Sequence, residues 1–149
     1  MTTLDKLLQA YYALEERPSD LCKLLKDHDF QLLPIDHRVA QIVVIDDLRI
    51  ICINHNIERK EFYILHEFAH YLLHINKINF LEASRKAENE ANMFACLYLL
   101  NGNLYDEYYE YILKSYEVPN NVIERYRDML YQYMQVQTYG IGWLRLECF

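Results

Sequence analysis

The chain has few of the residues that interrupt regular structure, with only 3 glycines and 3 prolines among 149 residues. So few breakers predict long helices and few elaborate loops. The chain also lacks any run of Lys and Arg, and its formal net charge is −7. Phosphate backbones attract clustered positive charge, so direct binding to DNA or RNA is disfavoured. A basic protein partner would be attracted more readily.

Marks of secreted and membrane proteins are also missing. The 4 cysteines form no CxxC pair, which excludes a zinc ribbon and a thioredoxin-like motif. The first 20 residues carry scattered charges around no apolar segment, unlike a signal peptide. No stretch approaches the ~20 apolar residues that span a membrane. We therefore expect a cytoplasmic protein, and its length predicts a single domain over residues 1–149.

The patterning changes twice along the chain. Apolar residues at helical spacing predict two helices first, over about 2–16 and 20–28. Three short segments rich in β-branched residues then predict strands at 30–35, 40–45 and 48–53. Asp46-Asp47 predicts a tight hairpin turn between the last two strands. Further helices are predicted at about 58–75, 82–100, 104–115 and 119–135, and Gly102 provides the stop after the second of these. The pattern of residues 138–149 indicates neither a helix nor a strand. This order predicts an α+β domain with a small antiparallel three-stranded sheet.

One predicted helix carries His66, Glu67 and His70, the pattern HExxH. Four residues of spacing place both imidazoles on one helix face, about 5–6 Å apart at Cβ, which suits two ligands of one tetrahedral ion. Glu67 projects beside this pair and can reach a water on the metal without binding the metal itself. The pattern therefore predicts two zinc ligands and a general base. The alternative is a pair of surface histidines beside an unrelated glutamate.

A catalytic zinc site needs a third protein ligand, and the next predicted helix offers Glu88 and Glu90. These two side chains point roughly 200° apart at ~100° per residue, so only one of them can face the metal. Asn92 shares the face of Glu88 and is a candidate to orient a ligand. His74, one turn beyond His70, either flanks the cleft or packs on the helix.

These motifs resemble those of a known family. The segment Tyr63-Ile-Leu-His-Glu-Phe-Ala-His-Tyr-Leu-Leu-His74, followed by Glu88-Asn-Glu-Ala-Asn-Met-Phe-Ala95, is similar to the ImmA/IrrE zinc peptidases over about residues 15–130. The resemblance implies a zincin-like active-site helix, with His66, His70 and Glu88 as zinc ligands and Glu67 as the catalytic base. The first Glu of an ExxxN/D pattern is the usual third ligand in thermolysin-like enzymes, which favours Glu88 over Glu90. Where the family has a glycine before the second histidine, this chain has Ala69.

The resemblance also implies a function. Members of the family, often encoded on phages and mobile elements, act on helix-turn-helix repressors and relieve repression. This chain is thus expected to be a zinc-dependent endopeptidase whose protein substrate is such a repressor. Two alternatives remain open: a zinc-containing module that sequesters a regulator without cutting it, and a peptidase with unrelated substrates.

Overall fold

The computed structural model describes residues 2–74 and 84–148, with side chains described up to residue 135. Two helices come first in the chain, α1 (Thr3–Ala13) and α2 (Leu21–Asp27). Three strands follow, β1 (Gln31–Ile35), β2 (Ala40–Ile45) and β3 (Leu48–Asn54). Helices α3 (Glu61–His74), α4 (Arg85–Leu99), α5 (Tyr109–Ser115) and α6 (Asn120–Cys148) complete the described part. The α+β class is confirmed.

The sheet has the three predicted strands, but it is mixed, so the expectation of an all-antiparallel sheet is wrong. β2 pairs antiparallel to β3 around the predicted Asp46-Asp47 turn, with Ile45 opposite Leu48. β1 pairs parallel to β3 on its other side, giving the order β1-β3-β2. Strand propensity does not determine which neighbour a strand takes. Pro34 lacks an N–H and so favours an edge position for β1, but it does not determine direction.

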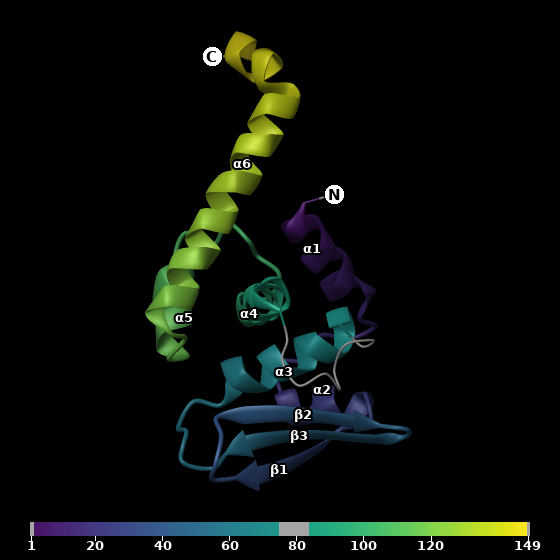
Figure 1. The fold of residues 1–149 in the computed structure, drawn as a ribbon. Coiled ribbons are helices and arrows are strands. Elements are labelled where there is room, and N and C mark those ends of the chain that lie inside the picture. The colour runs from purple at the N-terminus through teal and green to yellow at the C-terminus, as the bar shows by residue number, and fades with distance from the viewer. Residues whose placement is uncertain (1, 75–83, 149) are drawn as a thin grey trace.

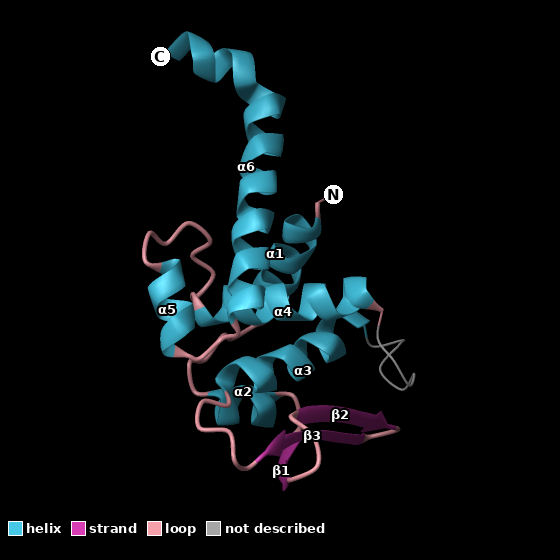
Figure 2. Ribbon diagram, turned by 60° about the vertical axis from the view of Figure 1, so that its left-hand side comes forward, coloured by secondary structure: helices cyan, strands magenta, loops and turns pink. Residues whose placement is uncertain are grey.

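The elements are stacked in layers over one face of the sheet. α3 lies between the sheet and α4, and α1 packs against α4 on the side away from the sheet (Figures 1 and 2). Ala69 of α3 and Ala91 of α4 are fully buried, and each lies one helical turn from a predicted ligand, His66 and Glu88 respectively. Such short side chains allow the two helix backbones to come close, which brings the ligand-bearing faces together.

Several helix boundaries differ from expectation, most of all the start of α5 and the end of α6. α5 begins at Tyr109 instead of about 104, because turns occupy the preceding residues and the Asp106 carboxylate accepts the N–H of Tyr108. α6 continues to Cys148, well past the predicted end at 135, and runs away from the body of the molecule (Figure 1). In the described part of the chain, no helix combines the length and the apolarity needed to cross a membrane.

Candidate metal centre

Helices α3 and α4 carry the residues predicted for the site. These are His66, Glu67, His70 and Glu88. The start of α4 is set by Ser84, whose hydroxyl accepts a hydrogen bond from the N–H of Ala87 at 3.1 Å. This N-cap sets where α4 begins and so places Glu88 in its first turn.

The side chains of His66, His70 and Glu88 converge at one point. The two Nε2 atoms are 3.2 Å apart. One Glu88 oxygen lies 3.0 Å from the Nε2 of His66, and the other lies 3.1 Å from the Nε2 of His70. The sequence-predicted ligand set is therefore brought together by the fold. Among the described residues, these three side chains form a group whose ligand atoms lie close enough together to hold one metal ion.

This arrangement fits a tetrahedral ion such as zinc. Donors held 2.0–2.1 Å from a tetrahedral centre lie about 3.3 Å from one another. The nitrogen–nitrogen and nitrogen–oxygen distances in the cluster are close to that value. Two imidazole nitrogens and one carboxylate are also a ligand set of catalytic zinc sites, in which three protein ligands leave a fourth position open.

The electrostatics of the cluster favour a cation. Hydrogen bonds from His66 and His70 hold the pKa of Glu88 far below its usual range, so this carboxylate is ionised at neutral pH. Burial by itself lowers the pKa of His66, but contacts with Glu88 and the charge of Glu67 outweigh burial and raise it. Positive charge is thus stabilised at the point where the three side chains meet.

Glu67 lies beside this cluster and is half-buried. Burial raises its pKa above the ordinary glutamate value, and the nearby charges of His66 and His70 only partly offset this effect. Its carboxylate accepts no hydrogen bond from the described residues. Glu67 is therefore a carboxylate next to the cluster with no hydrogen-bond partner among the described residues, which leaves it available to accept a proton.

Glu90, the alternative third ligand, is placed elsewhere. It is buried, and its two oxygens contact the Nε2 of His74 at 3.1 Å and the Nζ of Lys6 at 2.9 Å. Asn92 has the position expected for it, with its Oδ1 2.7 Å from the Nδ1 of His66. The sequence did not indicate Lys6, because no motif links a lysine of α1 to residues on α4.

A hydrolytic site also needs a donor for the oxyanion, but the buried tyrosines Tyr98 and Tyr126 are engaged in other hydrogen bonds. The Tyr98 hydroxyl donates to the carbonyl of Pro18 at 2.5 Å, and the Tyr126 hydroxyl donates to the carbonyl of Leu104 at 3.2 Å. Neither phenol is therefore directed at the cluster.

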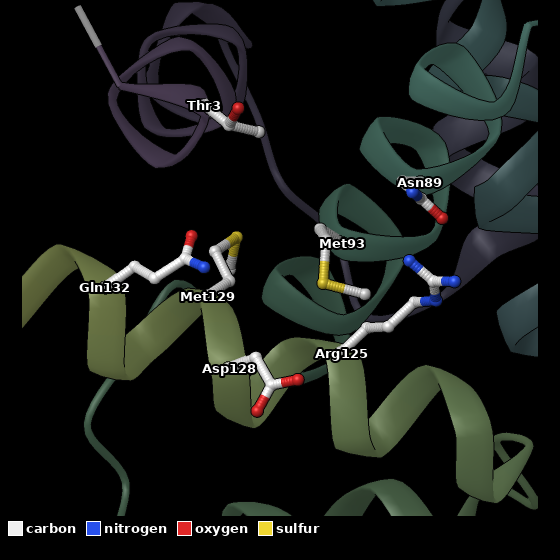
Figure 3. A pocket seen from close by; sticks show the side chains of 7 residues that line it. All are labelled: Thr3, Asn89, Met93, Arg125, Asp128, Met129 and Gln132. Atoms are coloured by element: carbon white, nitrogen blue, oxygen red, sulfur yellow. The ribbon is translucent and has the colours of Figure 1, made fainter.

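A separate hollow of about 280 Å³ lies between α1, α4 and α6. In Figure 3, Asn89 and Met93 of α4 face Arg125 and Met129 of α6 across it. Its lining includes none of the clustered ligands, because Asn89 points about 100° around the helix from Glu88. The hollow is thus distinct from the metal centre.

Comparison with known proteins identifies a family. Residues 26–131 match the family model of the IrrE N-terminal-like domain, Peptidase M78, and this range covers more than two thirds of the 149 residues. It includes α3 and α4, whereas α1 and the C-terminal part of α6 lie outside it. No match was found among curated proteins or among solved structures.

Proposed function

The chain belongs to the IrrE N-terminal-like family of peptidases, Peptidase M78, and on that premise we propose that it is a zinc-dependent endopeptidase acting on a helix-turn-helix transcriptional repressor. The observation that supports this proposal most strongly is the convergence of His66, His70 and Glu88 on one point beside Glu67. A structural zinc site needs only ligands, whereas a hydrolytic site also needs a base next to them.

In this proposal His66, His70 and Glu88 hold the metal. Imidazole and carboxylate donors in a tetrahedral set suit zinc better than calcium or magnesium, which prefer cages of oxygen ligands. When bound, zinc polarises the scissile carbonyl and lowers the pKa of its water toward about 7.

Glu67 acts as the proton carrier. Its carboxylate takes one proton from the attacking water as the oxygen adds to the carbonyl carbon. It then gives this proton to the leaving amine as the C–N bond breaks. Burial raises the pKa of Glu67, which strengthens it as a base relative to an exposed glutamate. Asn92 holds the ring of His66 in orientation throughout.

The proposed substrate follows from the resemblance of the motifs to the ImmA/IrrE peptidases. The net charge of −7 is consistent with a basic DNA-binding protein as the substrate, because long-range attraction speeds association. Cleavage of such a repressor would relieve repression of the genes that it controls.

The experiment is to incubate the zinc-loaded protein with a repressor encoded beside its gene, and to follow cleavage by mass spectrometry. A discrete cut is expected with the wild type. Glu67→Gln is the matched control, because it keeps the three ligands and removes the base. This variant should retain about one zinc per chain and lose cleavage by roughly 10²–10⁴-fold.

The possible outcomes separate the functions. Binding of the repressor without any cut would favour a sequestering module over a peptidase. Normal cleavage by Glu67→Gln would show that Glu67 is not the base. Cleavage of unrelated proteins with the repressor left intact would keep the peptidase chemistry and overturn the substrate.

A further inference from the structure

A chain of hydrogen bonds and an ion pair runs from the candidate metal centre to helix α1. The Nδ1 of His70 lies 3.1 Å from the Nδ1 of His74. The Nε2 of His74 lies 3.1 Å from one oxygen of Glu90, and the other oxygen of Glu90 lies 2.9 Å from the Nζ of Lys6. Each side chain in this hydrogen-bonded series therefore makes a polar contact with the next one.

The interior of this chain is removed from water. His74 is 9% exposed and Glu90 is 4% exposed. A buried carboxylate is costly unless both its oxygens have partners, and here each oxygen of Glu90 has one. Lys6 stands at the outer end, where 42% of its side chain is exposed, so solvent still reaches the ammonium. The series of contacts therefore runs from Lys6 at the surface to the proposed ligand His70.

The donors and acceptors have one consistent direction. If the Nε2 of His70 faces a metal, its proton is on Nδ1 and donates to the Nδ1 of His74. The proton of His74 is then on Nε2 and donates to Glu90, which accepts from Lys6 on its other side. His74 thus fixes the ring orientation of His70, Glu90 fixes that of His74, and Lys6 holds the Glu90 carboxylate in place.

The two histidine ligands are supported differently. His66 contacts Asn92, which lies on α4 within the matched family region. His70 is supported through His74 and Glu90 by Lys6, and Lys6 lies on α1, outside residues 26–131. The support of one ligand therefore depends on a segment that the family model does not include.

We propose that Lys6, Glu90 and His74 are positioning residues that orient the ring of His70. Through Lys6, helix α1 thereby contributes to metal binding. The proposal rests on the proposed metal site. It predicts that loss of any link loosens the His70 ring and weakens metal binding, typically by 10–100-fold for partners that orient a ligand.

A purely structural role for the same contacts makes a different prediction. The Lys6–Glu90 pair would then only hold α1 against α4, and its loss would lower stability without changing zinc affinity. The decisive quantity is therefore the zinc dissociation constant of folded protein, measured by competition with a chromophoric chelator. The visible spectrum of the Co²⁺-substituted protein reports independently on the geometry of the ligands.

Four variants test the proposal. His74→Phe and Glu90→Gln should raise the zinc dissociation constant about 10-fold or more and change the Co²⁺ spectrum. Lys6→Met should raise it several-fold, and Lys6→Arg should restore it. Lys23→Met is the matched control, since Lys23 pairs with Glu16 and Asp27 on the surface, away from the cluster, and should bind zinc like the wild type.

Failure would take distinguishable forms. If the wild type binds zinc and folded His74→Phe and Glu90→Gln bind it equally well, the positioning role is wrong and the proposed site survives. If those two variants do not fold, the zinc dissociation constant of Lys6→Met decides whether the positioning role is correct. This variant should fold, because the Lys6 side chain lies at the exposed end of the series of contacts. If the wild type itself binds no zinc, the proposed function and this inference both fail.

Discussion

At the scale of single residues, the carboxylates of Glu88 and Glu90 lie two positions apart on α4 and have different partners. Glu88 lies between two imidazoles and keeps part of its side chain in solvent, whereas Glu90 is buried between His74 and Lys6. The helical rotation of roughly 200° between them accounts for this division. In the proposed site, Glu88 is a metal ligand and Glu90 fixes the ring of a ligand behind it.

This difference gives a graded prediction for metal binding. Glu88→Ala removes a proposed zinc ligand, so it should weaken zinc binding more than Glu90→Ala, which removes only a contact behind His70. Zinc retained after dialysis, measured by atomic absorption, provides the test. Circular dichroism must show that both variants are folded. Stronger loss in Glu90→Ala would exchange the roles of the two residues.

The local part of the site could be predicted from sequence, and the remote part could not. The spacing of His66 and His70 determines their common face, because helical geometry repeats every 3.6 residues. Asn92 follows from Glu88 for the same reason. Lys6 depends on how α1 packs against α4, and no sequence period connects those helices. Helical geometry alone leaves Glu88 and Glu90 open as the third ligand, whereas the family resemblance favours Glu88.

At the scale of elements, the scarcity of glycine determines how the helices end. Asp29, Asn101 and Glu117 have φ values of 62°, 56° and 58° directly after the C-caps of α2, α4 and α5. In each case the next N–H reaches back five residues, as in the bond from Val118 to the carbonyl of Leu113 at 3.1 Å. This is a Schellman motif built on a non-glycine residue.

Such an ending has a measurable cost. A left-handed conformation costs a residue with a Cβ roughly 1–2 kcal/mol, and glycine avoids this at some loss of chain entropy. Glu117 is exposed, so Glu117→Gly should raise the free energy of unfolding, by up to about 1 kcal/mol. Lys114→Gly, in the last turn of α5, is the control and should lower it by a similar amount. Urea denaturation measures both, and equal destabilisation would contradict the argument.

Other features of the elements show where sequence patterns stop being informative. The predicted stop at Gly102 is correct, but the left-handed turn begins one residue earlier, at Asn101, and Gly102 continues it with φ 78°. A Cβ at Gly102 would lie 2.6 Å from the ring of Tyr11, so this glycine also lets α1 pack close to the turn that follows α4. Hairpin pairing is local and was predictable, whereas the parallel partner of β1 depends on the tertiary fold.

At the scale of the whole molecule, the candidate metal centre joins parts of the chain that are far apart in sequence. α3 carries two of the proposed ligands, α4 carries the third, and α1 reaches the same candidate centre through Lys6. A bound ion would therefore hold α3 and α4 together in the folded state. Because an unfolded chain rarely offers a preformed site, metal binding should add to the free energy of unfolding.

The stabilisation by bound zinc depends on the ratio of its concentration to its dissociation constant. A ligand that binds only the folded state stabilises it by about 2.7 kcal/mol at 100 times its dissociation constant. Each kcal/mol shifts the melting temperature of a chain of this size by roughly 2–4 °C, so zinc should raise Tm by roughly 5–10 °C and a chelator should reverse the shift. Glu88→Ala, which lacks one ligand, should show a smaller rise at the same zinc concentration. An equal rise in both proteins would place the stabilising zinc outside the cluster of His66, His70 and Glu88.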